Sequence, residues 1–246
     1  MANTTLERPI RIAFLVAVLF GFQCAVGKAG HLVAGLFDYS RIDPYNAFGA
    51  NCVHHLVMLA LSLAVIVTLS KTTPLNFHFG TGNVALGKKF TWIFTAACAV
   101  VAIGTHIMMK FNGNLPIYGF PLQGDTIAGT LGFQLLLTGP AEEMLYRMLP
   151  IPLFVWAVES EHKSFIKIPY AVLLAALIFA SAHMKWSFSP LGVQAEPFAV
   201  LYAFAMGIIQ GYAYYRCRSI VYPILMHSFS NVLMVGTGYV CIALFS

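Results

Sequence analysis

Three charged side chains lie in the middle of a long apolar stretch of the sequence, residues 126–158: Glu142, Glu143 and Arg147. A charge at the centre of a membrane-spanning helix costs about 2.5–3.5 kcal/mol on insertion scales, so a partner or a function is expected. Glu143 and Arg147 are four residues apart, share a helix face and can form an ion pair. Glu142 projects about 100° away from that face and has no such partner. An uncompensated carboxylate inside a helical bundle is a candidate general base.

Two histidine-bearing segments lie further along the chain. The first ends in Phe179-Ala-Ser-Ala-His183, and the second contains His227 and Asn231, four residues apart on one helix face. Glu142 lies 20 residues before His162, the centre of the loop between the two spans, and His183 lies 21 residues after it. An antiparallel hairpin therefore brings Glu142 and His183 to the same depth. Packing at a span end, and hydrogen bonding between helices, remain the structural alternatives for these residues.

Other polar or small residues in the spans have structural interpretations. His54 and His55 are consecutive, so they do not face one cavity together. Gly207 and Gly211 form a small-xxx-small pattern, which is typical of a helix-packing face.

The elements that position these groups are membrane helices. The chain has 246 residues, of which 59% are hydrophobic and only 9% charged. This excludes soluble enzymes, nucleic-acid-binding proteins and disordered linkers, because soluble domains carry about a quarter charged residues. We expect an all-α fold, a polytopic transmembrane bundle forming one domain over 1–246, with the site in a membrane-embedded cavity. Seven segments are long enough to span: 11–36, 47–70, 90–109, 126–158, 167–184, 197–215 and 220–245. The fourth contains Pro140, Pro150 and Pro152, and we expect it to be kinked or broken, with its far end outside the membrane.

Basic residues predict the orientation of the bundle. Nine lie in the amino terminus and the even-numbered loops: Arg8, Arg11, Lys71, Lys88, Lys89, Lys163, Lys167, Arg216 and Arg218. Three lie in the other loops: Arg41, Lys110 and Lys185. The amino terminus is therefore expected in the cytoplasm and the carboxyl terminus outside. A cleaved signal peptide, with Ile12–Cys24 as its apolar region, is the alternative interpretation of the first span.

The three segments together carry a resemblance. Glu142-Glu-Met-Leu-Tyr-Arg147 matches EExxxR, Phe179 to His183 matches FxxxH, and His227 to Asn231 matches HxxxN. In this order, on separate spans, they resemble the CAAX protease and bacteriocin-processing (CPBP) family of intramembrane endopeptidases, the type II CAAX prenyl endopeptidases included. The resemblance covers residues 120–240, the expected protease core, and leaves residues 1–110 as accessory spans.

This resemblance implies hydrolysis of a peptide bond near the carboxyl terminus of a membrane-associated protein or peptide, prenylated or plain. Glu142 and His183 would activate the attacking water, and His227 and Asn231 would stabilise the oxyanion. Glu143, Arg147 and Phe179 would support the site. These residue types suit a base and oxyanion donors. No cofactor is expected. Glu142, His183 and His227 are also donors that zinc accepts, although no HExxH helix is present.

Two other classes of function remain open at this stage. One is a catalytically idle immunity or scaffold protein that binds a peptide partner, and the other is a proton-coupled small-molecule transporter that uses Glu142 as its relay. The expected partners are the lipid bilayer and a membrane-associated substrate, without nucleic acid. The expected location is a bacterial cell membrane.

Overall fold

Five long apolar segments form single helices in the computed structural model, which describes residues 4–158 and 167–245. They are α1 Thr4–Ala34, α2 Gly49–Thr72, α3 Val84–Phe111, α8 Pro197–Cys217 and α9 Val221–Phe245. Each is long and apolar enough to cross a membrane, and together they match five of the seven predicted spans. Large apolar side chains such as Trp92 and Val100 point outward, whereas Glu143, Arg147 and His227 are buried. This distribution suits a bundle whose outer surface contacts lipid.

The segment predicted as the fourth span is a helix with two wide turns. It runs through α4 Gly124–Phe133, the π-helical η1 Gln134–Thr138, α5 Gly139–Glu143, the π-helical η2 Met144–Met148 and α6 Pro150–Val158. Each π-helical turn ends two residues before a proline, Pro140 or Pro150. Proline has no N–H for the regular helical ladder, and a π turn reroutes the bonds nearby. The Leu149 N–H, for example, donates to the Met144 carbonyl five residues back, at 3.0 Å.

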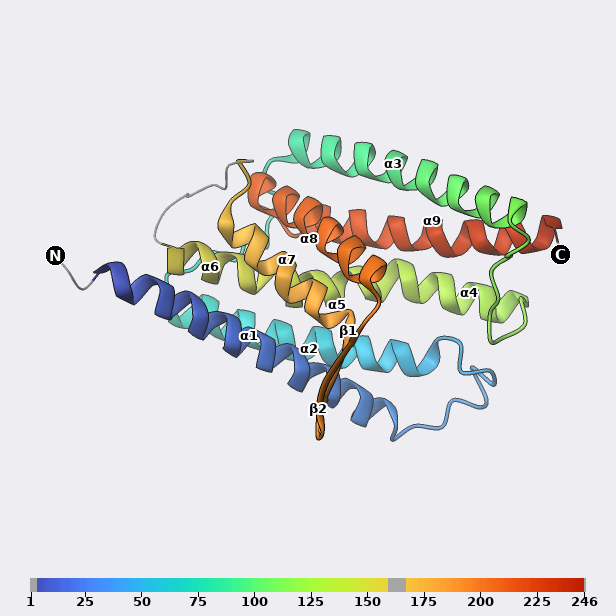
Figure 1. Ribbon diagram of the computed structural model, residues 1–246, viewed down its shortest axis with the longest axis horizontal. Helices are drawn as coiled ribbons and strands as arrows, with labels where there is room; N and C mark the ends of the chain where they lie inside the picture. The colour runs from blue at the N-terminus through green and yellow to red at the C-terminus, as the bar shows by residue number, and fades with distance from the viewer. Residues whose placement is uncertain (1–3, 159–166, 246) are drawn as a thin grey trace.

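The remaining helix, α7 Tyr170–Ala182, is short. Its 13 residues fall below the roughly 20 that one straight crossing needs. The count of seven spans therefore stays a prediction. Figure 1 shows the amino and carboxyl ends of the chain at opposite ends of the bundle, with α3 beside α9, α1 beside α2 and α7 beside α8.

A β-hairpin follows α7, and the sequence analysis did not predict it. Strands β1 Met184–Phe188 and β2 Leu191–Ala195 pair antiparallel, with Met184 opposite Ala195. Trp186 anchors the hairpin, because its indole Nε1 donates to the Ser181 carbonyl at 2.8 Å and its ring packs edge-on against Phe20 of α1. The fold is therefore helical apart from this hairpin within the described residues.

Close helix contacts place α5 between α2 and α9 (Figure 1). Gly139 makes the contact with α9 possible, since a Cβ atom there would lie 2.8 Å from the Ile224 carbonyl oxygen. Gly207 of α8 similarly meets Ala176 of α7, which confirms the predicted small-residue packing face. The contacts of α5 with α2 and α9 bring the carboxylates of Glu142 and Glu143 next to the histidines of these two flanking helices.

The start of α2 is fixed by the carboxylate of Asp43. Its two oxygens accept the backbone N–H groups of Ala47, Phe48 and Gly49 at 2.7–2.8 Å. Burial alone raises the pKa of this carboxyl, but the three N–H donors outweigh burial and hold the pKa below its ordinary value. The cap matters to the site because α2 carries His55.

Candidate active site

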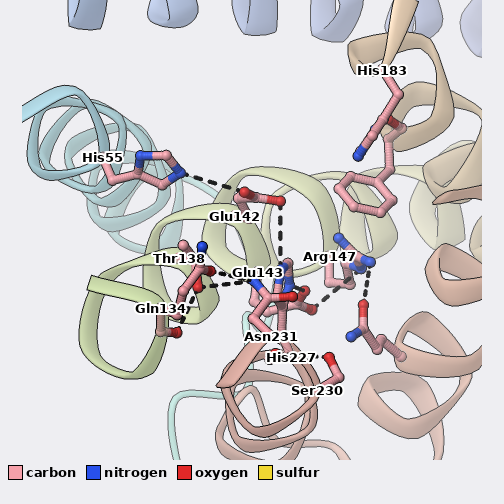
Figure 2. Close-up of polar contacts among 12 residues, drawn as sticks. His55, Gln134, Thr138, Glu142, Glu143, Arg147, His183, His227, Ser230 and Asn231 are labelled. Atoms are coloured by element: carbon pink, nitrogen blue, oxygen red, sulfur yellow. Dashed lines mark hydrogen bonds and ion pairs between the residues drawn. The ribbon is translucent and has the colours of Figure 1, made fainter. Parts of the chain in front are cut away.

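The Glu142 carboxylate lies between two imidazole rings from two different helices. Its Oε1 is 3.4 Å from Nε2 of His55 on α2, and its Oε2 is 3.7 Å from Nε2 of His227 on α9 (Figure 2). The Glu142 side chain keeps 22% of its surface exposed. Glu142 is the most exposed member of this cluster, since the side chains of His55 and His227 are 13% and 9% exposed.

The hydrogen bonds of the two rings determine which of their nitrogens carries hydrogen. Nδ1 of His55 lies 2.9 Å from the Asn51 carbonyl oxygen, and Nδ1 of His227 lies 2.7 Å from Oε1 of Glu143. A carbonyl or carboxylate oxygen only accepts, so each Nδ1 is the N–H donor. Each Nε2 then turns a lone pair toward Glu142 unless it is also protonated. The three groups stay together only if at least one proton is shared between Glu142 and a ring.

Glu143 and Arg147 form the predicted ion pair behind this cluster. Arg147 Nε lies 3.2 Å from Glu143 Oε2, and the two side chains are 1% and 0% exposed. The guanidinium also donates to Gln210 Oε1 at 2.5 Å and lies 4.0 Å from the centre of the Phe179 ring. Glu143 thus joins Arg147 to Nδ1 of His227. Glu143 is fully buried, whereas the neighbouring Glu142 is partly exposed.

Asn231 lies one turn beyond His227 on α9 and faces η1. Its Nδ2 donates to Gln134 Oε1 at 2.9 Å and to Thr138 Oγ1 at 3.2 Å. The first π-helical turn supplies both acceptors. The carboxamide is therefore oriented by η1, and one of its N–H bonds must be redirected before it can donate to a bound oxyanion.

His183 is placed apart from the Glu142 carboxylate in Figure 2. It follows the last residue of α7, with Nδ1 3.2 Å from the Phe179 carbonyl oxygen and its ring edge-on to the Phe179 ring. Among the described residues no hydrogen bond or ion pair joins His183 to Glu142. The pairing of His183 with Glu142 stays a prediction. Phe179 contacts Arg147 and His183 and lies 6.5 Å from the His227 ring, between centroids.

Sequence reasoning missed His55. It lies 87 residues from Glu142 and on a helix with no motif of its own. The His54 ring packs against His31 at 4.2 Å between centroids, and His55 faces Glu142, although the two neighbouring histidine rings are themselves 5.2 Å apart. The spacing of the two histidines does not indicate which of them faces Glu142.

A catalytic zinc ion takes three protein ligands and keeps one position open. Within residues 4–158 and 167–245, no three His, Cys, Asp or Glu side chains are arranged to hold a metal ion. Of the three donors considered, His183 is the one that does not contact the others.

Comparison with known proteins adds one finding. Residues 125–233 match the family model of type II CAAX prenyl endopeptidase Rce1-like proteins. The match covers less than half of the chain and is a similarity of this segment to that family. The match contains Glu142, Glu143, Arg147, His183, His227 and Asn231. It begins after α1, α2 and α3, so His55 on α2 lies outside it. No curated protein and no solved structure matches the chain significantly. The five apolar helices, together with the similarity of residues 125–233 to the Rce1-like family, indicate an integral membrane protein.

Proposed function

We propose that the protein is an intramembrane endopeptidase in which Glu142 is the general base. The observation that supports this most directly is an accessible carboxylate held between two imidazole Nε2 atoms, with a fully buried Glu–Arg pair behind it. The similarity of residues 125–233 to the Rce1-like family supports the same reaction class. A purely structural network has no need to leave Glu142 exposed to water.

The proposed reaction is the hydrolysis of one peptide bond. Glu142 takes a proton from a water molecule as the water oxygen attacks the carbonyl carbon of the substrate. The proton then passes to the leaving nitrogen as the carbon–nitrogen bond breaks, which releases a new carboxyl terminus and a new amine. His227 and Asn231 stabilise the oxyanion of the tetrahedral intermediate, and His183 orients the water.

The proton shared among Glu142, His55 and His227 gives His55 a part in this reaction. His55 holds one carboxylate oxygen, so the other stays turned toward His227 and the attacking water. A protonated His227 is in turn a better donor to the oxyanion, and Glu143 stabilises its charge through Nδ1. His55 is thus a positioning residue supplied by a helix outside the segment that matches the Rce1-like family.

The proposed substrate is a membrane-associated protein or peptide cleaved near its carboxyl terminus, as the family description implies. The test uses purified protein in detergent and synthetic peptides that end in a cysteine and three further residues, in farnesylated and plain forms. Mass spectrometry of the products should show loss of the last three residues. Cleavage of the farnesylated peptide alone would define a prenyl endopeptidase, and cleavage of both a broader peptidase. Intact peptides, together with uptake or proton flux in proteoliposomes, would contradict the proposal and favour a transporter.

We also propose that the amino terminus is cytoplasmic. In Figure 1 the amino end, the 73–83 loop and the α8–α9 turn lie at one end of the bundle. These segments and the helix turns next to them contain Arg8, Arg11, Lys71, Lys88, Lys89, Arg216 and Arg218. In a protein whose native cysteines are replaced by serine, Arg41→Cys should react with an impermeant maleimide in intact cells. Lys71→Cys should react only after permeabilisation, and the reverse pattern would invert the orientation.

A further inference from the structure

A cavity lies at the basic end of the bundle, away from Glu142. It has a volume of about 690 Å³ and is formed where the 74–78 loop, α6, the residues just before α7 and the end of α8 meet. No residue of the Glu142 cluster lines it. A ligand bound here would therefore use chemistry that the proposed hydrolysis does not.

The wall of this cavity is amphipathic. Lys167, Arg216 and Arg218 supply three permanent positive charges, and Val155 and Trp156 of α6 supply an apolar side. None of the described lining residues is acidic, and no ion pair is formed by these three cations within the described part of the chain. The charges are thus available to an anion from outside the protein.

The backbone that carries the cations is fastened in place. Arg218 has a left-handed φ of 51°, and its N–H caps α8 by donating to the Tyr214 carbonyl at 2.9 Å. The loop opposite is tied to the same turn, since Tyr214 Oη donates to the Phe77 carbonyl at 3.0 Å and the Ile220 N–H donates to the His78 carbonyl at 3.3 Å. The part of the rim that carries Arg216 and Arg218 is therefore held in place by hydrogen bonds to backbone carbonyls.

Arg216 and His78 supply hydrogen-bonding groups at the rim of the cavity. The Arg216 guanidinium donates to Tyr212 Oη at 2.7 Å, which holds the planar group at the mouth of the cavity. Burial and the neighbouring Arg218 lower the pKa of His78, so this ring is neutral at pH 7 and adds a hydrogen-bonding group without a fourth charge. Guanidinium groups suit tetrahedral oxyanions because their N–H groups form paired, charge-assisted hydrogen bonds.

We propose that this cavity binds a phosphate group, carried either by an anionic phospholipid of the adjoining membrane surface or by a soluble phosphorylated molecule. The tendency of cytoplasmic loops to carry Lys and Arg explains how many cations this end has. It does not explain why three of them surround one cavity with an apolar wall. Basic pockets at the ends of membrane helices bind phospholipid headgroups in this way.

The test compares two double variants with equal loss of charge. Lys167→Gln/Arg218→Gln removes two rim cations. Lys71→Gln/Lys89→Gln removes two exposed cations from the same end of the bundle that do not line the cavity. Native mass spectrometry in neutral detergent measures the binding of phosphatidylglycerol, phosphatidylcholine, glycerol 3-phosphate and inorganic phosphate.

The wild type and the Lys71/Lys89 control should bind phosphatidylglycerol at least about tenfold more tightly than the rim variant does, because charge-assisted hydrogen bonds are lost. Binding of phosphatidylglycerol but not of glycerol 3-phosphate or inorganic phosphate would support a lipid as the source. Equal binding of the soluble phosphates would support a soluble ligand in the same cavity. Equal weakening in the two variants, or no preference of the wild type for any phosphate probe over phosphatidylcholine, would overturn the proposal.

Discussion

Replacing Arg147 with methionine should cost much of the stability of the fold. Methionine is apolar and unbranched, so it fills most of the space while removing the charge. The change leaves the carboxylate of Glu143, which is 0% exposed, with His227 as its remaining partner. It also leaves Gln210 Oε1 without its donor. Loss of one partner from a buried ion pair typically costs about 3–5 kcal/mol, and we expect Arg147→Met to fall in this range.

A double-mutant cycle separates the ion pair from other effects of the substitution. Glu143→Gln, Arg147→Met and the double variant are unfolded reversibly in mixed micelles, with helix content measured by circular dichroism. The double variant removes both charges, so it should be more stable than the sum of the single losses predicts, by at least about 1 kcal/mol. An Arg147→Met protein that unfolds within about 0.5 kcal/mol of the wild type would refute the reasoning, as would strict additivity in the cycle.

Two further predictions concern α2. His55→Gln should reduce peptide cleavage by up to about 10²-fold and change its pH profile, because the Glu142 carboxylate is misplaced and one proton site is lost. The neighbouring substitution His54→Gln is the control and should change neither. A His55→Gln protein with the wild-type rate and pH profile would remove His55 from the site. Asp43→Asn keeps one acceptor oxygen but removes the negative charge beside the start of α2, so it should destabilise the fold by about 0.3–1 kcal/mol at neutral pH. Because the folded state lowers the pKa of Asp43, this stabilisation is present above the unfolded pKa of about 3.9 and is lost as the pH falls through the folded value. The stability difference between wild type and Asp43→Asn should therefore vanish in acid, and a difference independent of pH would contradict the role of the charge.

Local spacing was enough to predict much of the fold and part of the site. The apolar stretches predicted α1, α2, α3, α8 and α9 with boundaries within seven residues, because length and hydropathy largely decide whether a segment can span. The ion pair followed from the four-residue spacing of Glu143 and Arg147. Contacts between distant segments of the chain could not be predicted from such spacing. The bond from His227 to Glu143 and the approach of His55 to Glu142 depend on how helices pack, which no spacing within one helix determines.

The π-helical turns and the β-hairpin were not predicted from the sequence, for different physical reasons. The π-helical turns η1 and η2 each add a residue to a turn, so positions along 134–148 do not follow a regular 3.6-residue phase. Pro140 and Pro150, which follow these turns, predicted only a kink or break in the helix. The hairpin did have a signal. Apolar and polar residues alternate along Met184–Phe188, Ser189-Pro190 marks a turn, and alternation resumes at Leu191. Because this stretch lies between two predicted spans, 167–184 and 197–215, it was expected to be a connecting loop.

The most direct test of the account is the cleavage rate of Glu142→Gln. Glutamine keeps nearly the same shape and removes the ability to accept a proton from water, so the variant should fold and melt like the wild type. Product formation from the farnesylated and plain peptides, measured as new carboxyl termini by mass spectrometry, should fall by about 10²–10⁴-fold. Cleavage at the wild-type rate by a well-folded Glu142→Gln protein would contradict the assignment of Glu142 as the base.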